Sequence, residues 1–317
     1  MARAAEGPQG RPVTSAELST EGSAVVLSQF DYIAPTTIKA AVSALQEPGC
    51  VALAGGHHLL TLLKRRELAV RQLVDLRQVR ELRGIEPDAD GGLRIGALTT
   101  LTELLEHPTV RSAQGIGALE DAVSGLGDQQ GRNRVTIGGQ LASGRTGNDL
   151  AAALMVLGTT MHLSGAWGDR SVPLTDLWGD GSQLQLRPGE LITGVYVEPA
   201  WAGSGYARMT NRATLEAVCG VAAAVVPAAD GRIEHCRVAA VGAMVRPGRI
   251  AIMEESILGA TGSDGVAPPP ADAPFVDDHL ASADYRRHMT WVLAGAALDL
   301  ALVRAVPLRA CVTPEGA

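Results

Sequence analysis

Hydrophobic positions near the start of the chain alternate between helical and extended patterns. One helical face is predicted by the i, i+3, i+4, i+7 spacing of Ile38, Ala41, Val42 and Leu45. The apolar run over residues 50–54 then ends at Gly55 and Gly56, which predicts a strand followed by a tight turn. Residues 1–27 show no such periodicity, so we expect them to form a flexible arm.

The same alternation continues through the rest of the chain. Residues 135–137 predict a short strand that leads into a second glycine pair, Gly138 and Gly139. Residues 221–226 and 238–241 are further apolar strand candidates. A long C-terminal helix is predicted to bury the face that carries Met289, Val292, Leu293, Ala296, Ala297 and Leu300.

Composition narrows the class of protein. The chain has 317 residues, of which 46% are hydrophobic and 19% charged, so it is long enough for two domains. The net charge of −7 and the lack of a basic stretch argue against nucleic acid as a partner. No apolar run reaches the roughly 20 residues of a membrane span. The four cysteines are scattered, so we expect no metal site, no disulfide scaffold and a cytoplasmic location.

The two glycine pairs are the strongest candidates for a binding site. A pyrophosphate needs backbone N–H groups that approach it closely, and glycine permits this because it lacks a Cβ atom. Each pair is predicted to follow a strand, and Thr136 adds a hydroxyl donor. Either pair alone would more simply be a turn. The dinucleotide pattern G-x-G-x-x-G and the P-loop pattern are both absent from the sequence.

Several motifs are distributed from Phe30 to about Leu308. They are Phe30-x-Tyr32-x-Ala34-Pro35, Ala54-Gly55-Gly56-His57, Leu73-Val74-Asp75-Leu76, the stretch from Arg132 to Gly139 through Asp149-Leu150, Gly189-Glu190-Leu191-Ile192, and residues 282–287. Together these motifs resemble one family, the FAD-binding (medium) subunit of molybdenum hydroxylases, which includes the flavoprotein subunits of carbon monoxide dehydrogenase and xanthine dehydrogenase.

The resemblance implies an α+β fold, in which a two-lobed α/β FAD-binding domain of the vanillyl-alcohol-oxidase (PCMH) type precedes a C-terminal domain with a small antiparallel sheet and packed helices. The expected units are the arm at 1–27, lobe 1 at 28–80, lobe 2 at 81–200 and the C-terminal domain at 205–312. The implied FAD ligands are Ala54, Gly55, Gly56, His57, His58, Leu59, Thr136, Gly138, Gly139, Gln140, Ser143, Asn148, Asp149, Ile192 and Arg208. Tyr206 and Arg208 are the implied neighbours of the flavin ring, while the catalytic residues themselves are not identified.

Some positions depart from the family pattern or allow two roles. Gln140 replaces the usual Asn, Arg208 the usual Lys, and Leu215 stands where Asp is common. His57 is expected to line a non-covalent pyrophosphate loop, although a histidine after Gly-Gly bonds covalently to flavin in some unrelated flavoproteins. Asp149 is expected either to cap the helix that starts near residue 150 or to bind the cofactor's sugar.

Three functions remain open on the sequence alone. In the first, the chain is an electron-transfer subunit that receives electrons from iron–sulfur clusters and works beside molybdopterin and 2Fe–2S subunits. In the second, it is a stand-alone FAD enzyme that acts on a small molecule in specialised metabolism. In the third, it is a scaffold without cofactor, which the intact glycine loops disfavour.

Overall fold

The computed structural model describes residues 29–145, 147–179, 184–199, 201–211 and 217–305. The expected N-terminal arm and the unusual Leu215 lie outside these ranges. Three separate sheets organise the described residues. The first two lie within the expected lobes, and the third begins at Gly203, two residues before the expected C-terminal unit. The division into domains itself stays a prediction.

The first sheet is parallel and has the strand order β1-β3-β2. Its helix α1 buries Ala41, Val42 and Leu45, as the apolar spacing predicts, and begins at a Thr37 cap. Because parallel strands need crossover connections, helices link successive strands here. The elements are β1 (Asp31–Ile33), α1 (Ile38–Leu45), β2 (Cys50–Leu53), α2 (Leu59–Lys64), β3 (Gln72–Asp75), η1 (Leu76–Gln78) and η2 (Arg80–Leu82).

The second sheet is antiparallel, with the order β4-β5-β8-β6-β7. Helix α8, which belongs to the same stretch of chain, has all eight of its residues buried. The elements are β4 (Ile85–Pro87), β5 (Leu93–Gly96), α3 (Leu101–Glu106), α4 (Pro108–Ser112), α5 (Gly117–Gly125), α6 (Gln129–Arg132), α7 (Ile137–Ala142), α8 (Asp149–Val156), β6 (Thr160–Gly165), β7 (Gly168–Pro173), η3 (Leu174–Leu177) and β8 (Leu191–Val197).

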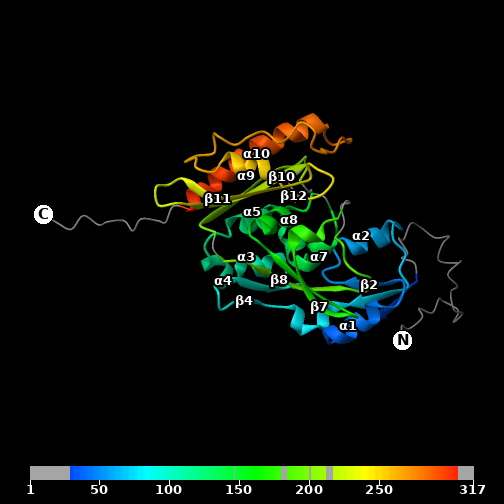
Figure 1. Ribbon diagram of the computed structural model, residues 1–317. Helices are drawn as coiled ribbons and strands as arrows, with labels where there is room; N and C mark the ends of the chain where they lie inside the picture. The colour runs from blue at the N-terminus through cyan, green and yellow to red at the C-terminus, as the bar shows by residue number, and fades with distance from the viewer. Residues whose placement is uncertain (1–28, 146, 180–183, 200, 212–216, 306–317) are drawn as a thin grey trace, which may run out of the picture.

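The third sheet, with the order β12-β11-β10-β9, is covered on both faces. Figure 1 shows α9 and α10 on its outer side, with α5 and α8 beneath it. Strand β10 is therefore buried along residues 219–225 rather than alternating between buried and exposed. The elements are β9 (Gly203–Met209), β10 (Cys219–Pro227), β11 (Ile233–Val241), β12 (Gly248–Arg249), α9 (Ala251–Ser256) and α10 (Ala283–Ala305).

The predicted buried face of α10 is partly wrong, because Leu293 and Ala297 are buried as expected but the centre of the face is rotated by about one position. Val292 and Leu300 are exposed, whereas Ala294 and Ala301 are completely buried. The small alanines let the helix approach strand β9 closely, and a Cβ atom at Gly203 would lie 2.0 Å from the Ala301 carbonyl oxygen. Backbone proximity, which hydrophobic spacing does not encode, decides which face is buried.

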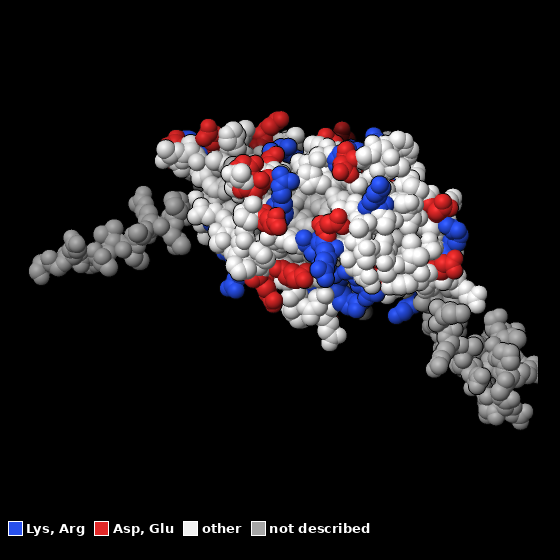
Figure 2. All heavy atoms as spheres, turned by 90° about the horizontal axis from the view of Figure 1, so that it is seen from below, with Lys and Arg blue, Asp and Glu red and all other residues white. Residues whose placement is uncertain are grey.

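The surface mixes both signs of charge on the face that Figure 2 shows, with one group of basic side chains near its middle. No single sign dominates that face. None of the helices in the described ranges combines the length and the apolar character that crossing a bilayer requires.

Candidate functional site

A cavity of about 510 Å³ lies where the two glycine pairs meet, and we call it the glycine-loop cavity. The loop after β2, helix α7 and the start of β8 build its walls. It brings together most of the residues predicted from the sequence, namely Ala54, Gly55, Gly56, His57, His58, Leu59, Thr136, Gly138, Gly139, Gln140, Ser143 and Ile192.

The first glycine loop, residues 54–59, presents donors to this cavity. Gly56 has φ +78°, a conformation that favours glycine, and its carbonyl oxygen accepts the Leu60 N–H as α2 begins. Within the described ranges, no protein acceptor takes the N–H groups of Gly55, Gly56 or His57. These amides are therefore available to an anion in the cavity.

The second glycine loop, residues 136–139, differs from the prediction. Its expected strand is absent from the described residues, where Thr136 makes only an isolated bridge to Thr100 and then caps α7. The Gly138 N–H donates to the Ala97 carbonyl at 2.9 Å, and the Gly139 N–H donates to the Thr136 Oγ1 at 3.2 Å. The idea that both pairs offer amides to a pyrophosphate is therefore wrong for this pair.

Close packing explains the glycines of the second loop instead. A Cβ atom at Gly138 would lie 2.7 Å from the Ala97 Cβ, and one at Gly139 would lie 2.8 Å from the Thr136 Oγ1. The Thr136 hydroxyl accepts the helix N–H and keeps its own proton, so it can still donate into the cavity as predicted.

Four predicted residues, Asn148, Asp149, Tyr206 and Arg208, are not among the described residues that line the cavity. Asp149 is completely buried and does not cap α8, because its carboxylate accepts hydrogen bonds from the Tyr206 hydroxyl and from Arg208 Nη1, the latter at 2.7 Å. Burial and the neighbouring Asp149 carboxylate raise the pKa of Tyr206 well above its usual value. The network joins α8 to β9, and contact of these residues with a flavin stays a prediction.

Asn148 lies between this network and the cavity. Its Nδ2 donates to the Gln140 carbonyl at 2.8 Å, and Gln140 lines the cavity. Its Oδ1 is buried and has no hydrogen-bond partner among the described residues. Asn148 itself does not line the cavity, so contact of this side chain with the cofactor stays a prediction.

Glu190 is the acidic group of the cavity, and its role was not predicted from the sequence. Its carboxylate pairs with Arg170 Nε and Nη2 at 2.6 and 2.7 Å. The Arg170 guanidinium lowers the pKa of Glu190, so the group stays ionised at neutral pH. Apolar walls complete the cavity, and no sequence pattern pointed to Ala97, Leu98, Leu184 or Leu186.

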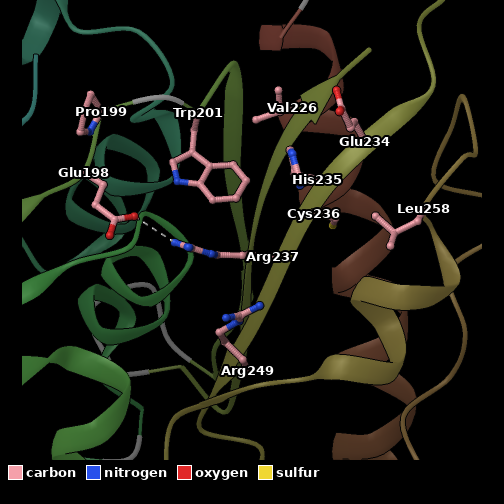
Figure 3. A pocket seen from close by; sticks show the side chains of 10 residues that line it. All are labelled: Glu198, Pro199, Trp201, Val226, Glu234, His235, Cys236, Arg237, Arg249 and Leu258. Atoms are coloured by element: carbon pink, nitrogen blue, oxygen red, sulfur yellow. Dashed lines mark ion pairs between the residues drawn. The ribbon is translucent and has the colours of Figure 1, made fainter. Parts of the chain in front are cut away.

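A second hollow, of about 460 Å³, lies between the end of β8 and strand β11 (Figure 3). In it, Arg237 lies 3.5 Å from Glu198 and stacks 4.8 Å from the Trp201 ring centre. Burial raises the pKa of the Cys236 thiol to about 12, so it is not a reactive thiolate. This hollow contains none of the predicted cofactor residues. Across the described residues, no three His, Cys, Asp or Glu side chains are grouped to hold a metal.

Residues 28–201 match the model of the FAD-binding domain in molybdopterin dehydrogenases, and the chain belongs to this family. Among its relatives is the carbon monoxide dehydrogenase medium chain of Hydrogenophaga pseudoflava, 30% identical over 87% of this chain and 98% of the relative. The glyceraldehyde dehydrogenase medium chain of Sulfolobus acidocaldarius is 29% identical over 84% of this chain and 95% of that protein.

Solved structures agree with the sequence relatives. A carbon monoxide dehydrogenase structure from Hydrogenophaga pseudoflava matches with a TM-score of 0.81 at 29% identity, covering 88% of this chain and 99% of the matched chain. Quinoline 2-oxidoreductase from Pseudomonas putida 86 matches with a TM-score of 0.78 at 26% identity, covering 89% of this chain and all of that one. The predicted family, α+β fold class and FAD cofactor are confirmed.

The glycine-loop cavity fits FAD in three respects. The available amides of the first loop suit the diphosphate, since backbone N–H groups bind phosphate oxygens closely. The Thr136 hydroxyl lines the cavity and can donate a further hydrogen bond to the cofactor. Apolar side chains such as Leu59, Leu62 and Ile192 suit flat aromatic rings.

Proposed function

We propose that this chain is the FAD-carrying electron-transfer subunit of a molybdenum hydroxylase-type dehydrogenase. The observation that carries the proposal is length: the chain covers 98% of one carbon monoxide dehydrogenase medium chain and 99% of a matched solved chain. It therefore corresponds to nearly the whole length of a medium chain. We expect its partners to be a molybdopterin subunit and a 2Fe–2S subunit, and a cytoplasmic location stays a prediction.

The residues of the chain bind and shield the cofactor in this proposal. FAD supplies the redox chemistry, since it exchanges electrons between an iron–sulfur centre and a final acceptor. The first glycine loop holds the diphosphate, and Gln140 and Ser143 line the cavity from helix α7 and its end, with Asn148 bonded behind Gln140. The apolar wall that includes Leu184 and Leu186 excludes water from the ring system.

Purification with a visible spectrum tests cofactor binding. We expect the full chain to be yellow, and acid precipitation to release FAD into the supernatant, because we place His57 in a non-covalent loop. A yellow pellet would show a covalent bond to flavin and correct the role of His57. A chain that stays colourless with added FAD would contradict flavin binding itself.

Co-expression with a molybdopterin subunit and a 2Fe–2S subunit of the same type of complex tests the electron-transfer role. We expect one complex on size-exclusion chromatography, and bleaching of the flavin when the substrate of the molybdenum subunit is added. If the chain alone oxidises a small molecule and binds no such subunit, it is a stand-alone flavoenzyme and the proposal fails.

A further inference from the structure

The reverse side of the first glycine loop bears a small pocket of about 140 Å³, which we call the arginine pocket. Arg77, Arg83 and Arg134 contribute to its walls from three separate parts of the chain. The pocket shares Ala54, Gly55, Leu98 and Thr136 with the glycine-loop cavity. The first loop is therefore a thin wall with the cofactor cavity on one side and arginine side chains on the other.

Arg134 is the arginine that hydrogen-bonds to the backbone of the first glycine loop. Its Nη2 and Nε lie 3.2 and 3.4 Å from the Gly55 carbonyl oxygen. The Arg134 backbone also packs on Gly55 so closely that a Cβ atom there would lie 1.7 Å from the Arg134 carbonyl oxygen. Both the side chain and the backbone of Arg134 thus fix the position of Gly55.

The three arginines differ in how far their charge is already neutralised. Arg77 pairs with Asp75 at 2.6 Å, and Arg83 lies 4.0 Å from Glu103. Arg134 has no carboxylate partner within the described ranges. Its positive charge therefore acts on the loop without a local counter-charge.

The direction of the Gly55 carbonyl determines where the next amide points. In a planar trans peptide unit, the C=O and the following N–H point in opposite directions. The Gly55 carbonyl faces Arg134 and the arginine pocket, so the Gly56 N–H faces the glycine-loop cavity. A charge-assisted bond to the carbonyl also polarises the peptide, which makes this N–H a stronger donor.

The charges that line the cavity do not by themselves neutralise a diphosphate. The FAD diphosphate carries two negative charges, yet the described lining of the cavity contains no lysine or arginine and includes the ionised Glu190. We infer that Arg134 is a positioning residue for the cofactor diphosphate, which holds the Gly55–Gly56 peptide in its donating orientation and supplies positive charge from behind the loop. This inference rests on the chain binding FAD.

The test compares FAD with riboflavin, which lacks the diphosphate, on the flavin-free full chain. Flavin fluorescence quenching gives both dissociation constants for wild type, Arg134→Gln and Arg134→Lys. We expect Arg134→Gln to weaken FAD about 10- to 100-fold while riboflavin changes less than about twofold. Arg134→Lys should recover part of the FAD affinity, because it keeps the charge but loses the planar fork.

Arg132→Gln is the matched control, because Arg132 lies two residues away and donates to the Leu126 and Gly127 carbonyls instead. It should leave the FAD affinity within about twofold of wild type. Salt provides a second measurement: FAD affinity of wild type should fall with ionic strength more steeply than that of Arg134→Gln.

Equal weakening of FAD and riboflavin would overturn the inference, since Arg134 would then only support the fold. An unchanged FAD affinity in Arg134→Gln would overturn it as well. If that variant does not fold, Arg134→Lys and the salt dependence of wild type decide, and a salt-independent FAD affinity counts against the inference. Failure of the wild type to bind FAD would refute the proposed function instead.

Discussion

Gly55→Ala is the most direct perturbation of the first glycine loop. The added methyl carbon would lie 1.7 Å from the carbonyl oxygen of Arg134 and 2.8 Å from its carbonyl carbon. Both atoms belong to the backbone, so no side-chain rotation relieves the clash. The two loops must part by about 1.7 Å to reach an ordinary contact near 3.4 Å.

The loss of cofactor affinity follows from that displacement. A shift of this size takes the amides of residues 55–57 out of hydrogen-bond range of the diphosphate. Two lost bonds to a charged group are worth about 3–4 kcal/mol, which weakens FAD binding about 100- to 1000-fold. Overpacking in the same place costs about 1–3 kcal/mol of folding stability.

Titration of the flavin-free chain with FAD measures the affinity, and thermal unfolding followed by circular dichroism measures the stability. Gly262→Ala is the control, because a Cβ atom there has no neighbour within 4 Å. It should change neither quantity. If Gly55→Ala binds FAD within about threefold of wild type, the first loop does not hold the diphosphate as described.

Three further predictions concern the fold around the site. Tyr206→Phe leaves the buried Asp149 carboxylate with one donor fewer, so chemical denaturation should show a loss of about 1–3 kcal/mol, and an unchanged stability would refute this role. Gly203→Ala, which forces α10 away from β9, should lower the melting temperature, whereas Gly295→Ala on the open side of α10 should raise stability by about 0.5–1 kcal/mol. The pKa of Glu190 is lower in the folded protein than in the unfolded chain. The ionised carboxylate therefore stabilises the fold fully above its unfolded pKa, and this stabilisation is lost as the pH falls through its folded pKa. Glu190→Gln should therefore lose less thermal stability than wild type between pH 7 and about pH 3, and parallel curves would count against the Arg170 pairing.

The spacing of hydrophobic residues correctly predicted elements that bury one face against a single neighbouring layer, such as α1 and β2. The spacing of Ile38, Ala41, Val42 and Leu45 matches α1, and the run before Gly55 matches β2. The first loop is also a local feature, because a buried strand followed by two glycines restricts the chain to a tight turn. The family resemblance extended these signals to the FAD cofactor, and most of the ligands that it implied line the cavity.

Contacts between distant parts of the chain decided the rest. Gly138 is a glycine because it packs against Ala97, some forty residues earlier, so its N–H is already satisfied and unavailable. Asp149 bonds to Tyr206 and Arg208 rather than capping its own helix, because the fold brings these two side chains of strand β9 to the start of α8.

The sequence by itself determined the α+β character, the family, the cofactor and the first glycine loop, since these depend on residue types at short spacing. Only the tertiary structure decided which amides remain free, which face of α10 is buried and which arginine stands behind Gly55. The physical reason is that a hydrogen bond or a close backbone contact is satisfied by whichever group the fold brings nearby, and the spacing of residues along the chain does not specify that group.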